Sequence, residues 1–286
     1  MSSDQPRDSP EFLRGVVIAE IGDGLAGAAA TAILAALGAE VTTVVNPESL
    51  LRQRVPALNV DGSTQSVLSA ILDADKTAAG SAPPSPTVTV VDRCEGAGPL
   101  SDMHVAKYLD HVYTHNHAVW VTISPFGLVG PHRQWQGTEL TIAAAGGLLS
   151  AVTDHQTGWP IKLAGNQALL SAGQVAALAT CHGLDEYARL GKPVHIDVSA
   201  QEAVVVTGPL LRVSNLLLNS AGETGARRYG APAGYYECRD GLVRISVMED
   251  HQWKALVRAI DAPAWTDAFI DGAARIERAD ELDANL

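Results

Sequence analysis

Cysteine is scarce in this sequence, and its spacing excludes two common kinds of stabilised domain. The 286-residue chain has 3 cysteines, Cys94, Cys181 and Cys238, and no C-x-x-C pair. Cysteines so far apart supply neither a disulfide framework nor the paired ligands of a zinc site. We therefore expect reduced thiols and no metal.

Long apolar runs are also missing. Gly, Thr or a charged residue interrupts every apolar stretch before it reaches the roughly 18 residues that a membrane-spanning helix needs. The N-terminal sequence MSSDQPRDSPEF is polar and acidic, unlike a secretory signal peptide. These absences predict a cytoplasmic protein with no membrane partner.

Positive charge is in short supply. The 20 Lys and Arg residues are outnumbered by 32 Asp and Glu residues, which gives a formal net charge of -12. A nucleic acid would be repelled, and no basic stripe offsets that repulsion, so we expect no nucleic-acid partner. Hydrophobic residues make up 47% of the chain, enough to build a real core in one large domain or two smaller ones.

The first ordered segment has the pattern of a β-α-β unit. Residues 15–21 are apolar and predict a buried strand, residues 28–37 predict an Ala-rich helix that Gly38 ends, and residues 41–45 predict a second strand. Strands joined through a helix in this way pair in parallel.

The alternation of strands and helices continues along the chain. A turn at Asp61-Gly62 and a long Gly- and Pro-rich loop at 125–137 separate the elements, and Ser199 with Glu202 has the spacing of a helix capping box. Helices are expected at 66–74, 139–151 and 166–190, and strands at 87–92, 118–124 and from 195. This order predicts the α/β class with a parallel sheet.

The character of the sequence changes near residue 222. A polar, Gly-rich stretch is followed by a hairpin pattern that turns at Asp240-Gly241, an amphipathic helix at 251–260 and a charged helical stretch at 274–286. We expect a polar leader at 1–14, a large domain at 15–222 and a small domain at 223–286.

The stretch GDGLAG, residues 22–27, fits the G-x-G-x-x-G pattern at a strand-to-helix junction, where backbone amides can meet a phosphate. An NAD site also needs an acid at the end of the second strand, but that strand ends in Asn46 and Glu48 comes late. Asp23 adds a negative charge inside the turn. The motif therefore argues against NAD and leaves two alternatives, a different phosphate-bearing ligand and glycines that only permit close packing.

Several segments, taken together and in order, resemble the family III CoA-transferases. The first strand, glycine turn and helix resemble that family's opening, and the later segments that do so are VWVTISPFGLVGPHRQWQG, GKPVHIDVSAQEAV, APAGYYECRDGLVRISV and FIDGAARIERADEL. The resemblance covers nearly the whole chain. It implies a Rossmann-like large domain, followed by the start of a small α/β domain.

The resemblance also implies a binding site for coenzyme A or an acyl-CoA as substrate, with no metal. The residues expected to hold CoA are Gly24, Leu25, Ala26, Gly27 and Arg52. Those expected to face the acyl group or acid are Ser124, Phe126, Gly127, Gly130 and His132. Trp135 lies on the same loop as His132 and is a further candidate for acyl or adenine contact.

The catalytic group of the family is missing at its expected position. The family's nucleophile is an Asp four residues before a Gly, and here the residue four before Gly173 is Leu169. The racemase branch would want a basic His where Gly137-Thr138-Glu139 stands. Glu139 could instead be a first-turn helix acid, and Gln167 a helix-start amide, but both are the candidates left for catalysis.

These observations leave several functions open. One is a CoA-transferase-like protein that moves CoA between an acyl-CoA and a carboxylic acid, alone or with a partner chain. Another is a non-catalytic subunit or module of such an enzyme, which Leu169 favours. An acyl-CoA racemase and an NAD-dependent oxidoreductase are further alternatives. Because family members continue beyond the point that matches residue 286, we expect a homo- or hetero-oligomer with a family III chain.

Overall fold

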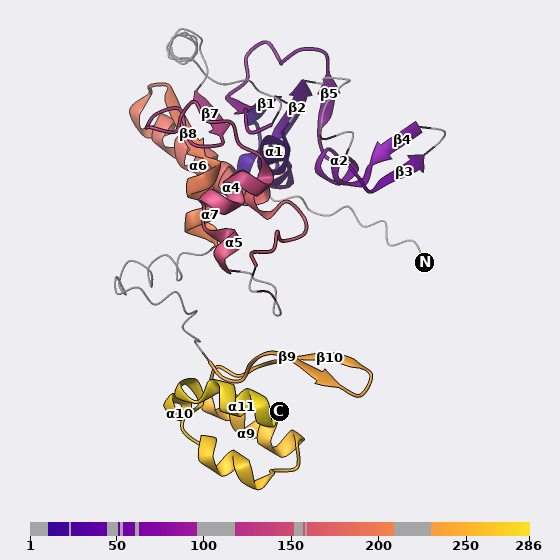
Figure 1. Cartoon of the computed structure of the whole chain (residues 1–286). Coiled ribbons are helices and arrows are strands. Elements are labelled where there is room, and N and C mark those ends of the chain that lie inside the picture. Colours follow the sequence, from indigo (N-terminus) through magenta and orange to yellow (C-terminus); the bar gives the residue numbers. More distant parts are fainter. Residues whose placement is uncertain are drawn as a thin grey trace. The chain divides into compact units, whose positions relative to one another are not determined.

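The computed structural model describes residues 11–22, 24–44, 51, 54–60, 63–95, 118–151, 157, 159–208 and 230–286 (Figure 1). The chain divides into two compact units, Met1–Leu218 and Asn219–Leu286. The sequence-based boundary between residues 222 and 223 and the first ten residues of the leader expected at 1–14 lie outside the described residues. The end of that leader forms the short helix η1 Glu11–Leu13, and Leu13 packs in the core.

A six-stranded sheet forms the centre of the first unit. Its strand order is β5-β2-β1-β6-β7-β8, and every neighbouring pair is parallel. This confirms the predicted α/β class and the opening β-α-β unit. The strands are β1 Val17–Ile21, β2 Glu40–Val44, β5 Thr77–Ala79, β6 Val88–Asp92, β7 Val119–Ser124 and β8 Val194–Ser199.

The strand order reverses at β1. From β1 the chain first adds β2 on one side, and later adds β6 on the other. In open parallel sheets ligands bind outside the carboxyl ends of the strands at such a reversal. The ends of β1 and β6, at Ile21 and Asp92, are therefore where a site is expected.

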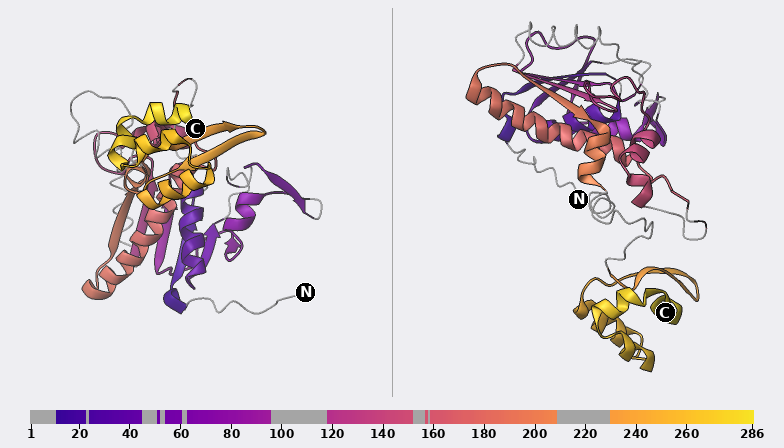
Figure 2. Two further views of the ribbon diagram at one scale, coloured as in Figure 1. Left: turned by 90° about the horizontal axis from the view of Figure 1, so that it is seen from below. Right: turned by 60° about the vertical axis from the view of Figure 1, so that its left-hand side comes forward.

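Two helices cover one face of the sheet at this point, α1 Leu25–Ala36 and α6 Gln167–Leu190 (Figure 2). Small residues let them approach closely, because a Cβ on Gly173 would lie 2.7 Å from the Ala26 carbonyl oxygen and 2.7 Å from the Ala29 Cβ. The strand side chains that face these helices, such as Val90, Val121 and Ile123, belong to the same apolar core. Burial of that surface is the main stabilising term of the unit.

The remaining elements of the first unit correct some expectations. The helix expected at 139–151 is two helices, α4 Glu139–Ala145 and α5 Leu148–Ala151, because Gly147 between them has a φ of 80°. The turn expected at Asp61-Gly62 lies outside the described residues, between two strands that pair with each other. The other elements are η1 Glu11–Leu13, β3 Ala57–Val60, β4 Ser63–Ser66, α2 Val67–Leu72 and α7 Ala200–Thr207.

The second unit has its own core. The predicted hairpin is confirmed as β9 Ala233–Cys238 and β10 Gly241–Ser246, and the amphipathic helix as α9 Asp250–Ala259. The charged stretch forms two helices, α10 Gly272–Glu277 and α11 Ala279–Asn285, after the short η2 Ala264–Phe269. The fully packed side chains of this unit are Ala231, Val247, Trp253, Phe269, Ala279 and Leu282.

Candidate functional site

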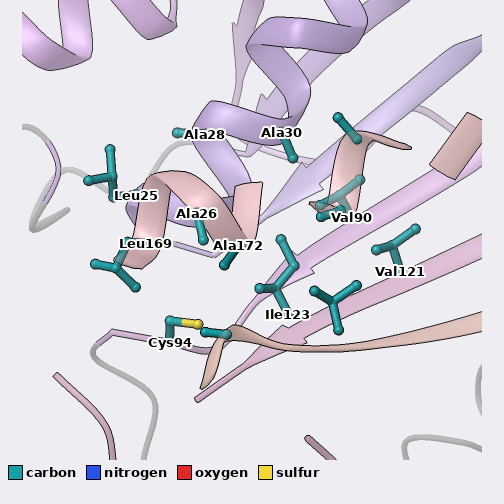
Figure 3. Close-up of a cluster of buried hydrophobic side chains, with 14 of the residues drawn as sticks. Leu25, Ala26, Ala28, Ala30, Val90, Cys94, Val121, Ile123, Leu169 and Ala172 are labelled. Atoms are coloured by element: carbon teal, nitrogen blue, oxygen red, sulfur yellow. The ribbon is translucent and has the colours of Figure 1, made fainter. Parts of the chain in front are cut away.

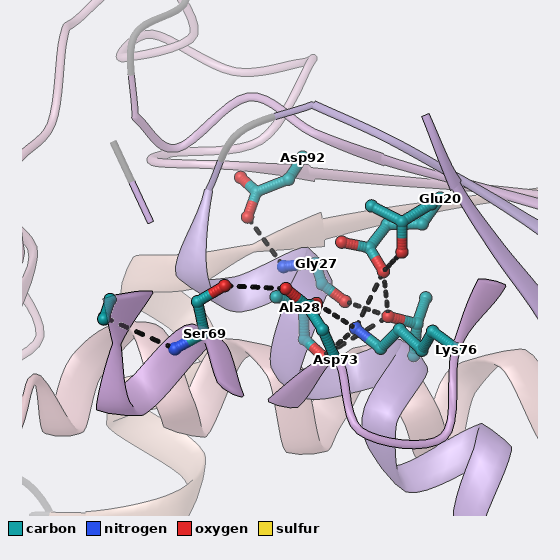
Figure 4. Close-up of polar contacts among 10 residues, drawn as sticks. Glu20, Gly27, Ala28, Ser69, Asp73, Lys76 and Asp92 are labelled. Carbon is teal, nitrogen blue, oxygen red and sulfur yellow. Dashed lines mark hydrogen bonds and ion pairs between the residues drawn. The ribbon is translucent and has the colours of Figure 1, made fainter. Parts of the chain in front are cut away.

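The carboxyl ends of β1 and β6 meet the N-terminus of α1, as the strand order requires. The Asp92 carboxylate lies directly against this helix end and accepts a hydrogen bond from the Gly27 amide at 2.6 Å (Figure 4). Its other oxygen accepts from the Cys94 amide at 2.7 Å. The side chain that occupies this helix end is therefore an acid of the chain itself.

Asp92 explains the glycines of the turn. A Cβ on Gly24 would lie 2.2 Å from the Asp92 Oδ2 atom, and a Cβ on Gly27 would lie 2.8 Å from the Asp92 Cβ. A Cβ on Gly22 would lie 2.4 Å from the Asp92 carbonyl oxygen. Among the alternatives for the motif, this geometry favours glycines that permit close packing.

A second carboxylate lies at the same helix end. Glu95 accepts a hydrogen bond from the Leu25 amide at 3.2 Å and forms an ion pair with Arg54. The predicted role of Gly24, Leu25, Ala26 and Gly27 in holding CoA thus stays a prediction that requires Asp92 and Glu95 to move. Arg52, predicted to hold CoA, lies outside the described residues.

Burial changes the acidity of Asp92, which is 5% exposed. Loss of water raises its pKa from 3.8 to about 6, helped by the nearby charges of Glu95 and Glu20, while the Gly27 and Cys94 amides act in the opposite direction. A carboxyl group with this pKa is still mostly ionised at neutral pH, so it can satisfy both amide donors.

Leu169, which the family resemblance aligns with the nucleophile, is a core residue. Its side chain is fully buried in the apolar cluster beneath the sheet, near Leu25 and Cys94 (Figure 3). The first-turn amides of α6 at Ala168 and Leu169 each donate to a different oxygen of Glu139, at 3.0 Å. Glu139 therefore caps α6 from the start of α4, and this end of α6 also carries a carboxylate of the same chain.

Gln167, the other catalytic candidate, points away from this arrangement. It is exposed, and its side-chain amide donates to the Ala164 carbonyl oxygen at 3.0 Å. The residue before it, Asn166, begins the helix with a φ of 54°. Gln167 is thus the first residue of α6, and its side chain contacts the connection that precedes the helix.

The loop at 125–137 is anchored to the neighbouring strand. Asp197 in β8 accepts a hydrogen bond from the Leu128 amide at 2.8 Å, and Gly127 has a φ of 82° that suits glycine. Gly130 has a φ of 93° and no atom within 4 Å of where a Cβ would stand. Ser124 is 2% exposed, and its Oγ has no hydrogen-bond partner among the described residues.

Three aromatic residues of this loop gather into one cluster. The Phe126 ring centroid lies 6.3 Å from that of His132 and 5.8 Å from that of Trp135, and the His132 and Trp135 centroids are 3.9 Å apart. Trp135 is 57% exposed. The structure therefore brings together Phe126 and His132, both predicted to face substrate, but their role in binding stays a prediction.

A buried polar network beside the turn has no counterpart among the sequence-based candidates. Lys76 pairs with Glu20 at 2.8 Å and donates to the Ala28 carbonyl oxygen at 2.9 Å, while Thr31 donates to Glu20 at 2.5 Å (Figure 4). The Lys76 side chain is 1% exposed and that of Glu20 4%. Because the charges satisfy each other, the network joins β1 to α1 and is structural.

Asp92 and Glu95 were also missed by the sequence reasoning. The available signal was the acid that ends the strand pattern TVTVVD, but nothing local indicates that its partner is a glycine 65 residues earlier. Within the described part of the chain, no group of three or more His, Cys, Asp and Glu side chains is arranged to hold a metal ion. In the same residues, no helix has the length and apolar character needed to cross a bilayer.

A protein-family model described as CoA-transferase family III matches residues 109–286. The "Probable CoA-transferase" of Mycobacterium tuberculosis is 31% identical over 155 residues, which cover 52% of this chain and 19% of that protein. The human "Succinyl-CoA:glutarate CoA-transferase" is 24% identical over 271 residues, covering 89% of this chain and 60% of that protein. The chain thus spans less than two thirds of the length of either relative.

Solved structures show the same fold. A CaiB/BaiF family protein from Brucella suis has a TM-score of 0.74 at 21% identity, and the match covers 96% of this chain and 76% of that one. Rv3272 from Mycobacterium tuberculosis has a TM-score of 0.71 at 19% identity, with coverage of 97% and 77%. At these identities the likeness concerns the fold alone.

Proposed function

The chain belongs to CoA-transferase family III, and from that premise we propose that it is a non-catalytic module of a CoA-transferase. In this proposal a second family III chain supplies the reactive carboxylate, and the present chain contributes its fold to the assembly. The substrates of the whole enzyme are then an acyl-CoA and a carboxylic acid.

The observation that carries the proposal is the chemistry and burial of the Leu169 side chain. In the chemistry that the family resemblance implies, an Asp carboxylate attacks the thioester carbonyl, the CoA thiolate leaves and an acyl anhydride forms on the enzyme. A leucine side chain has no lone pair with which to attack. Leu169 is also fully buried, so no substrate atom can reach its position without opening the core.

In this proposal the carboxylates near Leu169 do not act as the nucleophile in place of the missing Asp. Both oxygens of Glu139 accept amide hydrogen bonds from α6, and both oxygens of Asp92 accept amide hydrogen bonds from Gly27 and Cys94. A carboxylate that attacks a thioester must also reach the acyl carbon, whereas Glu139 and Asp92 are both buried. Each acid is explained by the helix end or turn that it satisfies.

A transfer assay tests the proposal. The purified chain is incubated with an acyl-CoA and a carboxylic acid that differs from the acid of the acyl group. Newly formed CoA thioesters are then separated by chromatography. The succinyl-CoA and glutarate pair, named for the human relative, is the first combination. We expect no product above the rate without protein, and transfer by the chain alone would contradict the proposal.

A further inference from the structure

We propose that the glycine turn at residues 22–27 is a carboxylate-binding turn whose occupant is Asp92 of the same chain. In this arrangement the N-terminus of α1 is closed to external anions, the phosphates of CoA included. The proposal goes beyond the proposed function, because it concerns what the turn binds and not whether the chain transfers CoA.

The surroundings of Gly24 support this assignment. The three atoms nearest to a Cβ placed on Gly24 all belong to the Asp92 carboxyl group, at 2.2 to 2.5 Å. Gly24 has a φ of -88° and a ψ of 155°, which any residue can adopt. The backbone therefore does not require glycine at this position, whereas the Asp92 side chain does.

The electrostatics of the helix end also favour an internal acid. The N-terminal amides of a helix are orphan donors with a partial positive charge, and they stabilise an anion placed against them. Here the Gly27 amide donates to Asp92 and the Leu25 amide donates to Glu95. An external phosphate would have to displace one carboxylate and would then lie against the other, which adds like-charge repulsion.

Asp92 is enclosed by the rest of the protein. The side chain is 5% exposed, and the acids that face it are Glu95 and Glu20. Burial costs the acid its hydration, and only specific hydrogen-bond donors can offset part of that cost. The Gly27 and Cys94 amides are those donors, so the turn and the acid form one unit.

A double-mutant cycle tests whether Asp92 is the reason for Gly24. Gly24→Ala, Asp92→Ala and the double variant are compared by thermal unfolding. We expect Gly24→Ala to lower the Tm by several degrees when Asp92 is present, and by less than half as much in the Asp92→Ala background. An equal loss in both backgrounds would overturn the proposal.

Anion rescue gives a second, independent readout. Formate is the small carboxylate closest to the deleted group, so it should raise the Tm of Asp92→Ala relative to chloride at equal ionic strength, while leaving the unmodified chain unchanged. Asp73→Ala, which removes a partly exposed acid bonded to Ser69 at 2.8 Å, is the matched control and should show no formate effect. No formate effect on Asp92→Ala would contradict a carboxylate-binding turn.

A variant that keeps a polar side chain guards against misfolding. If Asp92→Ala does not fold, Asp92→Asn replaces it, because an amide has the same shape as the carboxyl group and keeps the clash with a residue 24 side chain. The Gly24→Ala loss must then persist in Asp92→Asn, and its disappearance in that background would overturn the proposal. These unfolding measurements involve no CoA, so their failure is distinguishable from a failure of the proposed function.

Discussion

At the scale of single residues, two side chains decide what this site can do. Leu169, which the family resemblance aligns with the nucleophile, fills the core, and Asp92 lies against the backbone amides at the start of α1. Leu169 has no reactive group, and Asp92 is an internal partner for a helix end. Both side chains are buried, so the region at the carboxyl ends of the strands is closely packed.

The first prediction concerns Leu169. Leu169→Ala leaves a cavity in the core, and we expect the free energy of unfolding to fall by roughly 2–5 kcal/mol. Leu178→Ala, on the same helix at a position that is 74% exposed, is the control and should change it by less than about 0.5 kcal/mol. Urea denaturation measures both, and equal losses would show that residue 169 does not occupy the core.

The second prediction concerns pH. The pKa of Asp92 is about 6 in the folded chain against an ordinary 3.8. Between these values the folded state binds more protons than the unfolded state, so this group lowers the free energy of unfolding as pH rises. This decrease in the free energy of unfolding is complete above the pKa of the folded state and amounts to at most about 3 kcal/mol.

Asp92→Asn isolates that contribution because it cannot titrate. The stability of the unmodified chain relative to Asp92→Asn should therefore fall as pH rises from about 4 to about 7. Denaturant unfolding at several pH values measures this difference, with Asp75→Asn, the change of an exposed acid, as the control. Parallel curves for the unmodified chain and Asp92→Asn would contradict the assigned burial.

At the scale of elements, helix ends connect segments that are distant in the sequence. Glu139 at the start of α4 caps α6, and Asp92 at the end of β6 caps α1. In both cases the donor amides have no acceptor within their own helix. The acids therefore fix how each helix enters the layer that covers the sheet.

The third prediction tests the cap on α6. Glu139→Ala removes the acceptor for two buried amides, so we expect the free energy of unfolding to fall by roughly 2–4 kcal/mol. Glu202→Ala, which removes an exposed first-turn acid of α7, should cost less than about 1 kcal/mol. A Glu139→Ala cost as small as that of Glu202→Ala would mean that the two amides find other acceptors.

Periodicity in the sequence was sufficient for the elements that bury a continuous face. The strands 87–92 and 118–124 and the helix 166–190 were predicted within one or two residues. β5, Thr77–Ala79, was missed because the strand is short and partly exposed at the edge of the sheet. Such an edge strand has no apolar alternation from which to recognise it.

The site was less predictable than the fold. A local motif was sufficient to single out Leu169, and the loss of a nucleophile at this position stays a prediction. The role of Asp92 could not, since the parallel register that brings β6 beside β1 is a property of the folded sheet. Glu139 was both a catalytic candidate and a candidate first-turn acid, and it does lie in the first turn of α4, but the helix that it caps begins 28 residues later.

At the scale of the whole molecule, net charge and family membership indicate which classes of ligand and partner are compatible with the chain. The formal net charge of -12 opposes contact with other polyanions at long range. The described residues form two units, each with its own apolar core. The family match places the chain among proteins that act on CoA thioesters.

The fourth prediction follows from the net charge. The chain should pass through a heparin column at low ionic strength, where attraction to a polyanion would be strongest. An anion-exchange column at neutral pH is the positive control and should retain it. Retention on heparin would reveal a basic surface that the sequence does not indicate.

The most direct test of the account is a search for a covalent intermediate. The purified chain is mixed with succinyl-CoA, quenched with acid and examined by intact-protein mass spectrometry, with an active family III enzyme treated in the same way as control. We predict an unchanged mass for this chain and an acyl or CoA adduct on the control. An adduct on this chain, mapped by peptide analysis to Asp92 or Glu139, would show that an acid assigned here to a helix end is a nucleophile.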